Sequence, residues 1–536
     1  MNKWRIASLT VLVVLGGWLA LRSCTPAPPP AVIKPPAPPR EVFHASKPLD
    51  VVVHSATGPA ASEWLERELR FVLTRGKMRI APRSPATTAT SATRNFTLRI
   101  DLPDRAQSSN AHLSLLAPDG LVEREADAPL EFKDRLTTVQ SLSSYLPKFL
   151  GAATTTADWA SLVGTTEAET YEGFLVASSV LLDSTARGFT QPAHTRALAH
   201  SVEQLEALTR KNPGFARAHA LLAIGYLGLG GEDEASLTQI ADTTAKRVLA
   251  LDESLADAHG AMGLARLRRG EWISARERFE AALVIDVNAL PALEGLACLL
   301  TETGQMTAAV PIAEHAIALQ PGNVGARECL TYARIASSEP SSISSGTDAS
   351  SNDLAVARID ALSALLAGDL PKAENLLTGA AGGGNTWIKP LIRAASNRSA
   401  IPEALRAITL AASDGQIDAA TEVMCGAALH QADFVFNRMS RLQKQSEAVP
   451  LRILWLPQTA YLRQHRRFEQ IVTAVDLGSY WQEQGRPDIC EKEPQVYGCT
   501  LRPSAARTIA KPAVPSMTTP RPRRDPAAAG TPRAPP

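Results

Sequence analysis

Two cysteines near the end of the chain have the spacing best suited to covalent chemistry. Cys490 and Cys499 flank a charged, proline-containing loop, and a disulfide between them would tie down the end of the fold. The alternative is a pair of free thiols. The six cysteines form no Cys-x-x-Cys motif, and no histidine stands at metal-ligand spacing from them. Cys298, Cys329 and Cys425 lie in helical patterns, where we expect buried thiols.

The other residues capable of chemistry do not form a recognisable site. His219 and His259 occupy equivalent core positions of a repeat, and His315 is expected at the surface beside Glu314. No G-x-S-x-G or G-x-x-x-x-G-K-[ST] motif occurs. Residues 382–384 are glycines without the strand and helix that a phosphate loop needs. We therefore expect no catalytic residue, no cofactor, no metal ligand and no enzyme activity.

An internal repeat predicts the helices that would form a binding surface. Units begin at Ala216, Ala256 and Leu290, and the last two are 34 residues apart. The first unit has six extra residues, which we place in the turn at residues 228–231. The equivalent first-helix positions carry His219, Leu222, Ala223 and Tyr226, then His259, Met262, Gly263 and Arg266, then Leu293, Leu296, Ala297 and Leu300. This spacing is typical of tetratricopeptide helical hairpins, which must stack to bury their apolar faces.

The first helices of such a stack usually line a concave groove. Positions two, five, nine, twelve and thirteen of each unit predict the groove residues here. They are Arg217, Asp257, Leu264, Leu267, Arg268, Glu294, Thr301 and Glu302. This mixture of charged and aliphatic side chains suits a protein partner, whose identity the residues do not specify.

The N-terminal residues predict that the chain is exported from the cytoplasm. Residues 1–5 carry Lys3 and Arg5, and residues 6–22 are mostly apolar, although short for a span of roughly 20 residues. The segment is an uncleaved anchor, a lipoprotein signal with lipidation at Cys24, or a cleaved signal. Arg22, two residues before Cys24, departs from the lipoprotein pattern. We favour the anchor, which places a single-pass protein in a bacterial inner membrane with the bulk of its chain in the periplasm.

Composition predicts a mainly α protein with several parts. Few aromatic residues and abundant alanine suit stacked helices, and a net charge of +1 gives no overall positive electrostatic field that would attract nucleic acid.

The predicted parts are a basic cytoplasmic end (1–5), a membrane anchor or signal (6–22), a proline-rich linker (25–48), a small α+β domain (49–151), tetratricopeptide repeats forming an α-solenoid (166–335), a serine-rich loop (337–353), further hairpins with a closing block (354–500) and a disordered basic tail (501–536).

Three blocks carry a family resemblance. Residues 49–151 have a strand and a helix before a short strand at 78–84, an alternating strand at 96–101 and a hairpin at 115–124. An amphipathic pattern also predicts that a helix at 130–150 closes this domain. The join into the repeats is Asn-Pro-Gly-Phe-Ala-Arg-Ala at 212–218. The closing block has Leu-Trp-Leu-Pro at 454–457, Arg463, Arg-Phe at 467–468, Tyr-Trp at 480–481 and Pro-Asp-Ile-Cys at 487–490. Together these resemble the TolB-amino-terminal-like and tetratricopeptide module of bacterial membrane-integrated regulators and cyclases.

The resemblance implies an extracytoplasmic module whose relatives follow a cytoplasmic output domain across one membrane helix. Only five residues precede the membrane segment here, so we expect no output domain and no DNA binding or cyclase activity. Two functions remain open. One is a membrane-anchored protein-interaction scaffold in the bacterial envelope. The other is a detached sensory module that works with a partner carrying the output domain.

Overall fold

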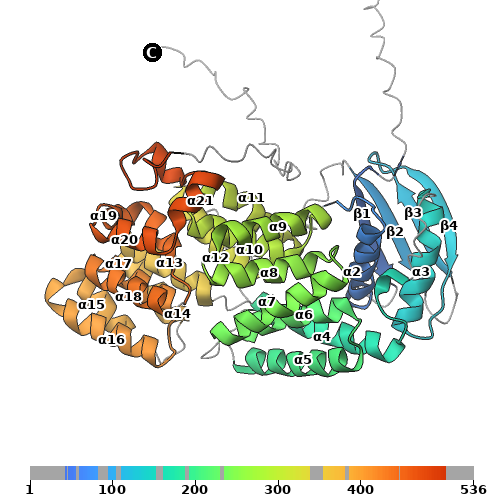
Figure 1. Ribbon diagram of the computed structural model, residues 1–536, viewed down its shortest axis with the longest axis horizontal. Helices are drawn as coiled ribbons and strands as arrows, with labels where there is room; N and C mark the ends of the chain where they lie inside the picture. The colour runs from blue at the N-terminus through green and yellow to red at the C-terminus, as the bar shows by residue number, and fades with distance from the viewer. Residues whose placement is uncertain are drawn as a thin grey trace, which may run out of the picture. The chain divides into compact units, whose positions relative to one another are not determined.

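The computed structural model describes residues 43–44, 46–55, 59–81, 95–103, 110–152, 161–187, 192–229, 234–337, 354–380, 386–445 and 447–502. Helices dominate these residues, and one four-stranded sheet lies near the N-terminal end (Figure 1), which confirms the mainly helical class with a small sheet. In this described part, no helix combines the length and apolarity needed to cross a bilayer. The predicted membrane segment, Cys24, and nearly all of the serine-rich loop and basic tail lie outside it.

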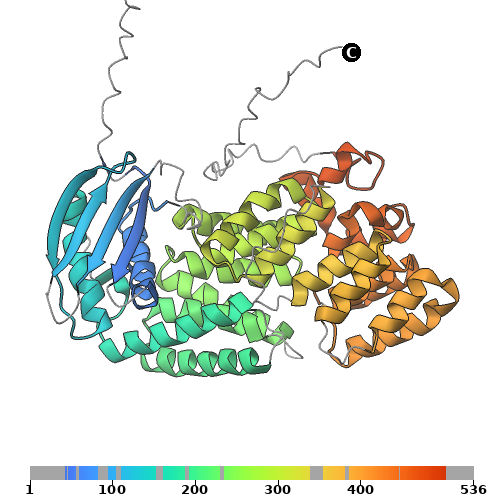
Figure 2. The same ribbon diagram turned by 180° about the vertical axis from the view of Figure 1, so that it is seen from behind.

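The sheet has the order β1-β2-β3-β4, with β1 (Leu49–Ser55) parallel to β2 (Phe96–Leu102). Strands β3 (Asn110–Leu116) and β4 (Val122–Pro129) continue it antiparallel. Helices α2 (Pro59–Arg75) and α3 (Arg135–Leu150) lie on the same face of the sheet, and Figure 2 shows the strands from the other face. Strands β1 and β2 alternate, and their buried residues share one apolar cluster with the two helices, whereas β4 buries only Ala128.

Two expectations for this domain need correction. Residues 78–81 form only an isolated bridge, between Ile80 and Leu49, rather than a full strand. The predicted helix at 130–150 begins at Arg135, because Asp134 caps it. The Asp134 side chain accepts from the backbone N–H of Thr137, and the Thr137 hydroxyl oxygen accepts from the backbone N–H of Asp134.

The buried core of this domain extends beyond its predicted start. Phe43 is buried and packs edge-on against Phe96, with ring centroids 5.2 Å apart. The same apolar cluster continues without interruption into the first helical hairpins. The sheet and the beginning of the helical stack are therefore held by one core.

Helical hairpins follow the sheet. Their bounds are η1 (Ser161–Val163), α4 (Ala168–Arg187), α5 (Pro192–Lys211), α6 (Ala216–Leu229), α7 (Glu234–Leu251), α8 (Ala256–Arg268), α9 (Trp272–Ile285), α10 (Leu290–Glu302), α11 (Met306–Leu319) and α12 (Val324–Ala336). Helices α8, α10 and α12 start 34 residues apart, which confirms the predicted period. The six extra residues are not in the turn alone, since α7 has 18 residues where α9 has 14.

The remaining helices form a second group. They are α13 (Leu354–Leu366), α14 (Leu370–Ala380), α15 (Ile388–Ser396), η2 (Arg398–Ala400), α16 (Ile401–Ser413), α17 (Ala419–Ala428), α18 (Ala432–Lys444), η3 (Leu451–Trp455), η4 (Pro457–Thr459), α19 (Ala460–Arg463), α20 (Arg467–Ala474), α21 (Leu477–Gln484) and η5 (Asp488–Glu491). We call residues 447–502 the closing block. Its apolar residues share one cluster with α9 to α12.

Two glycines let neighbouring helices approach closely. Gly263 on α8 and Gly295 on α10 both lie against the ring of Phe279 on α9. A methyl group on either glycine would overlap that ring. Gly263 stands at the same repeat position as the small residues Ala223 and Ala297, whereas Gly295 stands two positions earlier in its unit, where the repeat spacing does not indicate a small residue.

Replacing Gly295 by alanine should therefore destabilise the protein by about 1–3 kcal/mol, although alanine favours a helix over glycine. Urea denaturation of the two proteins measures the difference. Gly478→Ala in α21 is the matched control, since the nearest atom to its added methyl group is 3.6 Å away. We expect that control to be neutral or slightly stabilising, and an equally neutral Gly295→Ala would disprove the packing argument.

Candidate functional site

Arg217, predicted to line the groove, lies instead in a buried contact between α6 and α2. Its Nη1 and Nη2 atoms donate to the two carboxylate oxygens of Glu68 at 2.8 and 2.9 Å. The Tyr171 hydroxyl donates to the same carboxylate at 2.8 Å. The guanidinium also lies 3.8 Å from the ring centroid of Phe71 and 4.8 Å from that of Phe174. The sheet domain therefore covers this end of the predicted groove.

The charges of this pair depend on each other. Burial by itself would raise the pKa of Glu68, but the charge of Arg217 and the hydrogen bonds from Arg217 and Tyr171 outweigh it, so the pKa lies below its ordinary value. Burial opposes the charge of Arg217 as well, yet Glu68 raises its pKa overall. Both side chains are thus held ionised, in a site where neither would be stable alone.

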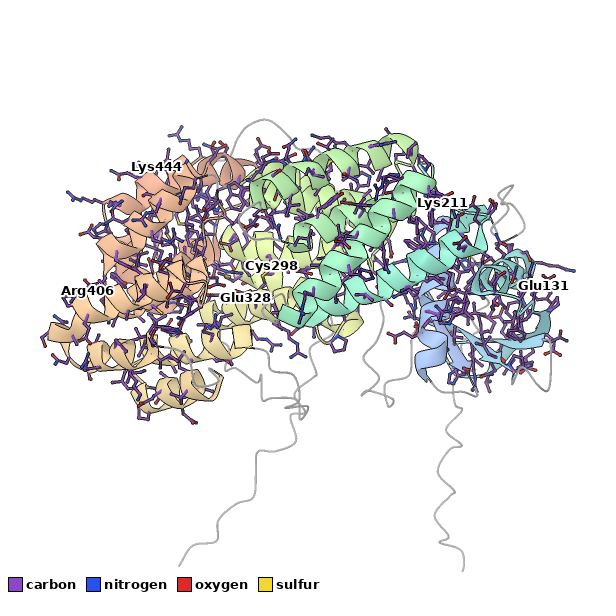
Figure 3. All side chains as sticks on the ribbon, turned by 90° about the horizontal axis from the view of Figure 1, so that it is seen from below. Glu131, Lys211, Cys298, Glu328, Arg406 and Lys444 are labelled. Atoms are coloured by element: carbon purple, nitrogen blue, oxygen red, sulfur yellow. A yellow bond between two sulfur atoms is a disulfide. The ribbon has the colours of Figure 1, made fainter. Side chains whose placement is uncertain are left out.

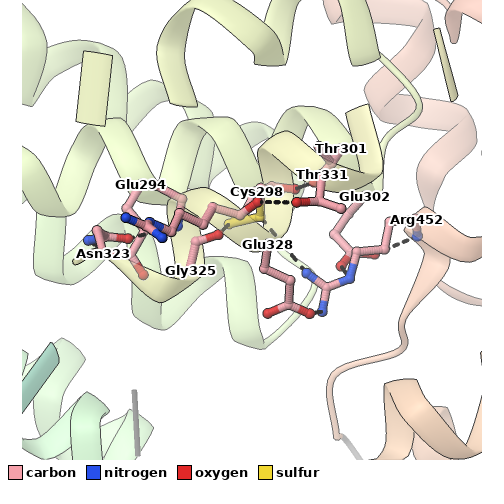
Figure 4. Close-up of a disulfide and its surroundings, with 12 residues drawn as sticks. Glu294, Cys298, Thr301, Glu302, Asn323, Gly325, Glu328, Thr331 and Arg452 are labelled. Carbon is pink, nitrogen blue, oxygen red and sulfur yellow. Dashed lines mark hydrogen bonds and ion pairs between the residues drawn. A yellow bond between two sulfur atoms is a disulfide. The ribbon is translucent and has the colours of Figure 1, made fainter. Parts of the chain in front are cut away.

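The other end of the predicted groove is covered by the closing block. Arg452 of η3 pairs with Glu302 of α10 at 3.3 Å and with Glu328 of α12 at 2.9 Å (Figure 4). Thr301 is fully buried, and its hydroxyl donates to the Cys298 carbonyl at 2.8 Å. Thr301 and Glu302 therefore bind the chain itself rather than lining an open surface.

The remaining predicted residues lie in the middle of the surface formed by the first helices of the hairpins, α6, α8, α10 and α12. Asp257 is exposed, and Leu264 and Leu267 are partly exposed. Arg268 pairs with Glu234 at 3.4 Å. Glu294 is partly buried and accepts from the amide of Asn323 at 2.9 Å. Since α4 contacts both α6 and α12, the free part of this surface is narrow.

A single turn of the helical stack receives much of the closing block. The indole N–H groups of Trp455 and Trp481 donate to the carbonyls of Glu302 and Thr303 at 2.8 and 2.9 Å. The Tyr480 hydroxyl donates to Gln305 at 2.9 Å. The closing block thus binds residues 302–305 through two backbone carbonyls and the Gln305 side chain, which fixes it at the end of α10.

The structure contains two disulfides in its described part. Cys490 and Cys499 are bonded, which is the first of the two alternatives given for them. Cys298 and Cys329 are also bonded, which corrects the expectation of two buried thiols. They lie on α10 and α12, which pack against each other. Cys425 is a buried free thiol, and burial raises its pKa.

The histidines of the repeats divide between confirmed and corrected predictions. His219 and His259 are buried, and Nε2 of each lies 3.2 and 3.0 Å from the carbonyls of Pro213 and Glu253, six residues earlier. His315 is not at the surface, because α11 turns it toward Asn288, with Nε2 3.0 Å from the amide oxygen. Burial lowers the pKa of His315 to about 4.

The protein should lose stability on acidification because of His315. Its folded pKa of about 4 lies below its ordinary value of 6.5, so the unfolded chain takes up the proton first. The stability that neutral His315 contributes to the folded state is present above pH 6.5 and is lost as the pH falls toward 4. At pH 5 this loss lowers the free energy of unfolding by about 2 kcal/mol. Urea denaturation at pH 7.5 and 5 should show a smaller acid loss for His315→Gln.

His112 supplies the control for that experiment. It is exposed on the sheet, and its hydrogen bond with Asp127 raises its pKa, so its contribution has the opposite sign. His112→Gln should not reduce the acid loss. An unchanged acid loss in His315→Gln would show that this histidine does not titrate in the range stated.

Sequence reasoning missed the two residues that close the predicted groove. Glu68 stands on an amphipathic helix and Arg452 in an aromatic-rich segment, and neither has a motif around it. Each lies about 150 positions from its partner, at separations of 149 and 150.

No protein-family model matches this chain, and no curated protein is significantly similar to it.

Proposed function

We propose that this chain is a membrane-anchored, extracytoplasmic tetratricopeptide-repeat scaffold of a bacterial envelope. The observation that carries the proposal is the run of first helices α8, α10 and α12, which start 34 residues apart and pack side by side. Stacks of this kind present a continuous surface to an extended segment of another protein. Asp257, Leu264 and Leu267 form the part of that surface left for a partner.

The compartment is part of the same proposal. Two disulfides favour an oxidising environment outside the cytoplasm. The apolar residues 6–22 would tether the chain, as an anchor or through a lipid on Cys24. A mass measurement of the mature N-terminus distinguishes these forms, and a reduced, untethered cytoplasmic protein would refute the assignment.

Photo-crosslinking in cells tests the scaffold. A photoreactive residue at exposed Asp257 should give a covalent adduct with one partner. The same residue at Val284 on α9, which is 65% exposed but belongs to a second helix, should not. Leu267→Glu should weaken the Asp257 adduct, because it adds a charge to the aliphatic part of the surface. Equal adducts at both positions, or none at Asp257, would contradict the proposal.

The alternative is a detached sensory module related to bacterial membrane regulators. The buried Glu68–Arg217 pair favours it, because the sheet domain and the stack would move as one unit. The crosslinked partner decides between the two functions. A protein with a cytoplasmic output domain supports the sensory module, and a structural envelope protein supports the scaffold.

A further inference from the structure

The two sulfurs of the Cys298–Cys329 disulfide have different surroundings. Cys298 on α10 is partly exposed, whereas Cys329 on α12 is fully buried. Nη1 of Arg452 lies 3.9 Å from Sγ of Cys329 (Figure 4). The disulfide belongs to the middle of the helical stack, where Cys298 and Glu328 are labelled in Figure 3. A thiol arriving from solvent would therefore meet Cys298 first.

Arg452 is suited to stabilise a departing thiolate. Its neighbours Glu302 and Glu328 raise its pKa even though burial opposes its charge, so it stays cationic. A positive charge beside a cysteine lowers the pKa of the thiol. A thiol of lower pKa is also the better leaving group in thiol–disulfide exchange. Sγ of Cys329, the buried sulfur, is thus the better leaving group of the two.

We propose that Cys298–Cys329 is a site of thiol–disulfide exchange with a dithiol reductant. A thiolate of the reductant attacks Sγ of Cys298, the S–S bond breaks, and the electron pair leaves on Sγ of Cys329 beside Arg452. The second thiolate of the reductant then attacks the other reductant sulfur, the one bonded to Cys298 in the mixed disulfide. Cys298 leaves as a thiolate. The reductant is oxidised to a disulfide by two electrons, and the two cysteines are reduced.

The surrounding charges indicate what kind of reductant fits. Glu294 and Glu302 stand one helical turn before and after Cys298 on α10, on the same face. Glu328 directly precedes Cys329. These three carboxylates outnumber the cations Arg268 and Arg452 beside them. An anionic thiol would therefore be repelled, whereas a dithiol with positive charges beside it would be attracted.

Reduction of the folded full-length chain tests the role of Arg452. The protein is treated with dithiothreitol in native buffer, and differential alkylation with mass spectrometry follows each cysteine. Cys298–Cys329 should open, and Arg452→Gln should slow its opening about tenfold. Arg452→Lys should restore most of the rate, while Cys490–Cys499 reacts equally in all three proteins. An unchanged rate in Arg452→Gln, or opening only where urea unfolds the chain, would overturn the proposal.

A second measurement needs no variant, so it holds even if Arg452→Gln fails to fold. Cysteamine and 2-mercaptoethanesulfonate carry opposite charges, and their mixed disulfides can be trapped by acid. Cysteamine should react faster, with the difference shrinking at high salt, and the adduct should be on Cys298. An adduct on Cys329, or equal rates for the two thiols, would refute the order of attack and the charge preference.

Discussion

Replacing Arg217 by alanine is expected to lower the free energy of unfolding by about 3–5 kcal/mol, because it leaves the Glu68 carboxylate buried without its counter-charge. The side chains of Glu68 and Arg217 are only 2% and 11% exposed. Urea denaturation at pH 7.5 measures the loss. The matched control is Lys211→Ala, which removes an ion pair with Glu169 whose members are 60% and 90% exposed. That control should cost less than about 1 kcal/mol.

The pH dependence gives the Arg217 prediction a second readout. In the native protein the pKa of Glu68 lies below 4.5, so the pair contributes stability above that pH and loses it as the pH falls through the folded pKa. Without Arg217, burial should raise the pKa of Glu68 above its ordinary value. The destabilisation should then be largest at neutral pH and shrink on acidification. A difference that does not change with pH would contradict the assignment to Glu68.

Replacing Trp481 by alanine should cost about 3–5 kcal/mol, because it removes one of the two buried indoles, with Trp455, that fix the closing block. Its indole donates to the Thr303 carbonyl at 2.9 Å, and its ring meets that of Trp455 edge-on at 5.7 Å. Gly498, with φ +97, lies so close that a Cβ there would overlap the Trp481 ring. The disulfide-bonded loop that ends at Cys499 therefore packs on this tryptophan.

Trp481→Phe separates packing from hydrogen bonding. It keeps a ring but leaves the Thr303 carbonyl without its donor, so the expected loss is smaller, about 1–3 kcal/mol. Hydrogen exchange at residues 302–305 should quicken more in Trp481→Ala than in Trp481→Phe. Leu410→Ala, at a residue 58% exposed, serves as the neutral control. Trp481→Ala within about 1 kcal/mol of the native protein would show that the block is held elsewhere.

The helical period and the elements of the small sheet could be read from the residues alone. The spacing from Ala256 to Leu290 recurs in the helices because each hairpin buries its own local pattern of apolar residues. The alternation in residues 96–102 likewise predicted a strand that is present. The short loop between Cys490 and Cys499, which are nine positions apart, made a disulfide one of two alternatives, and the structure contains it.

Contacts between distant segments could not be read in this way. Burial of Arg217 depends on Glu68, and coverage of Glu302 depends on Arg452, and in both pairs the partners are far apart in the chain. Cys298 and Cys329 lie on different helices, so their bond depends on the stacking of α10 against α12. Local patterns determined which helices and strands form, because those depend on near neighbours. Which of the groove residues stay free was decided only when the sheet domain and the closing block packed onto the stack.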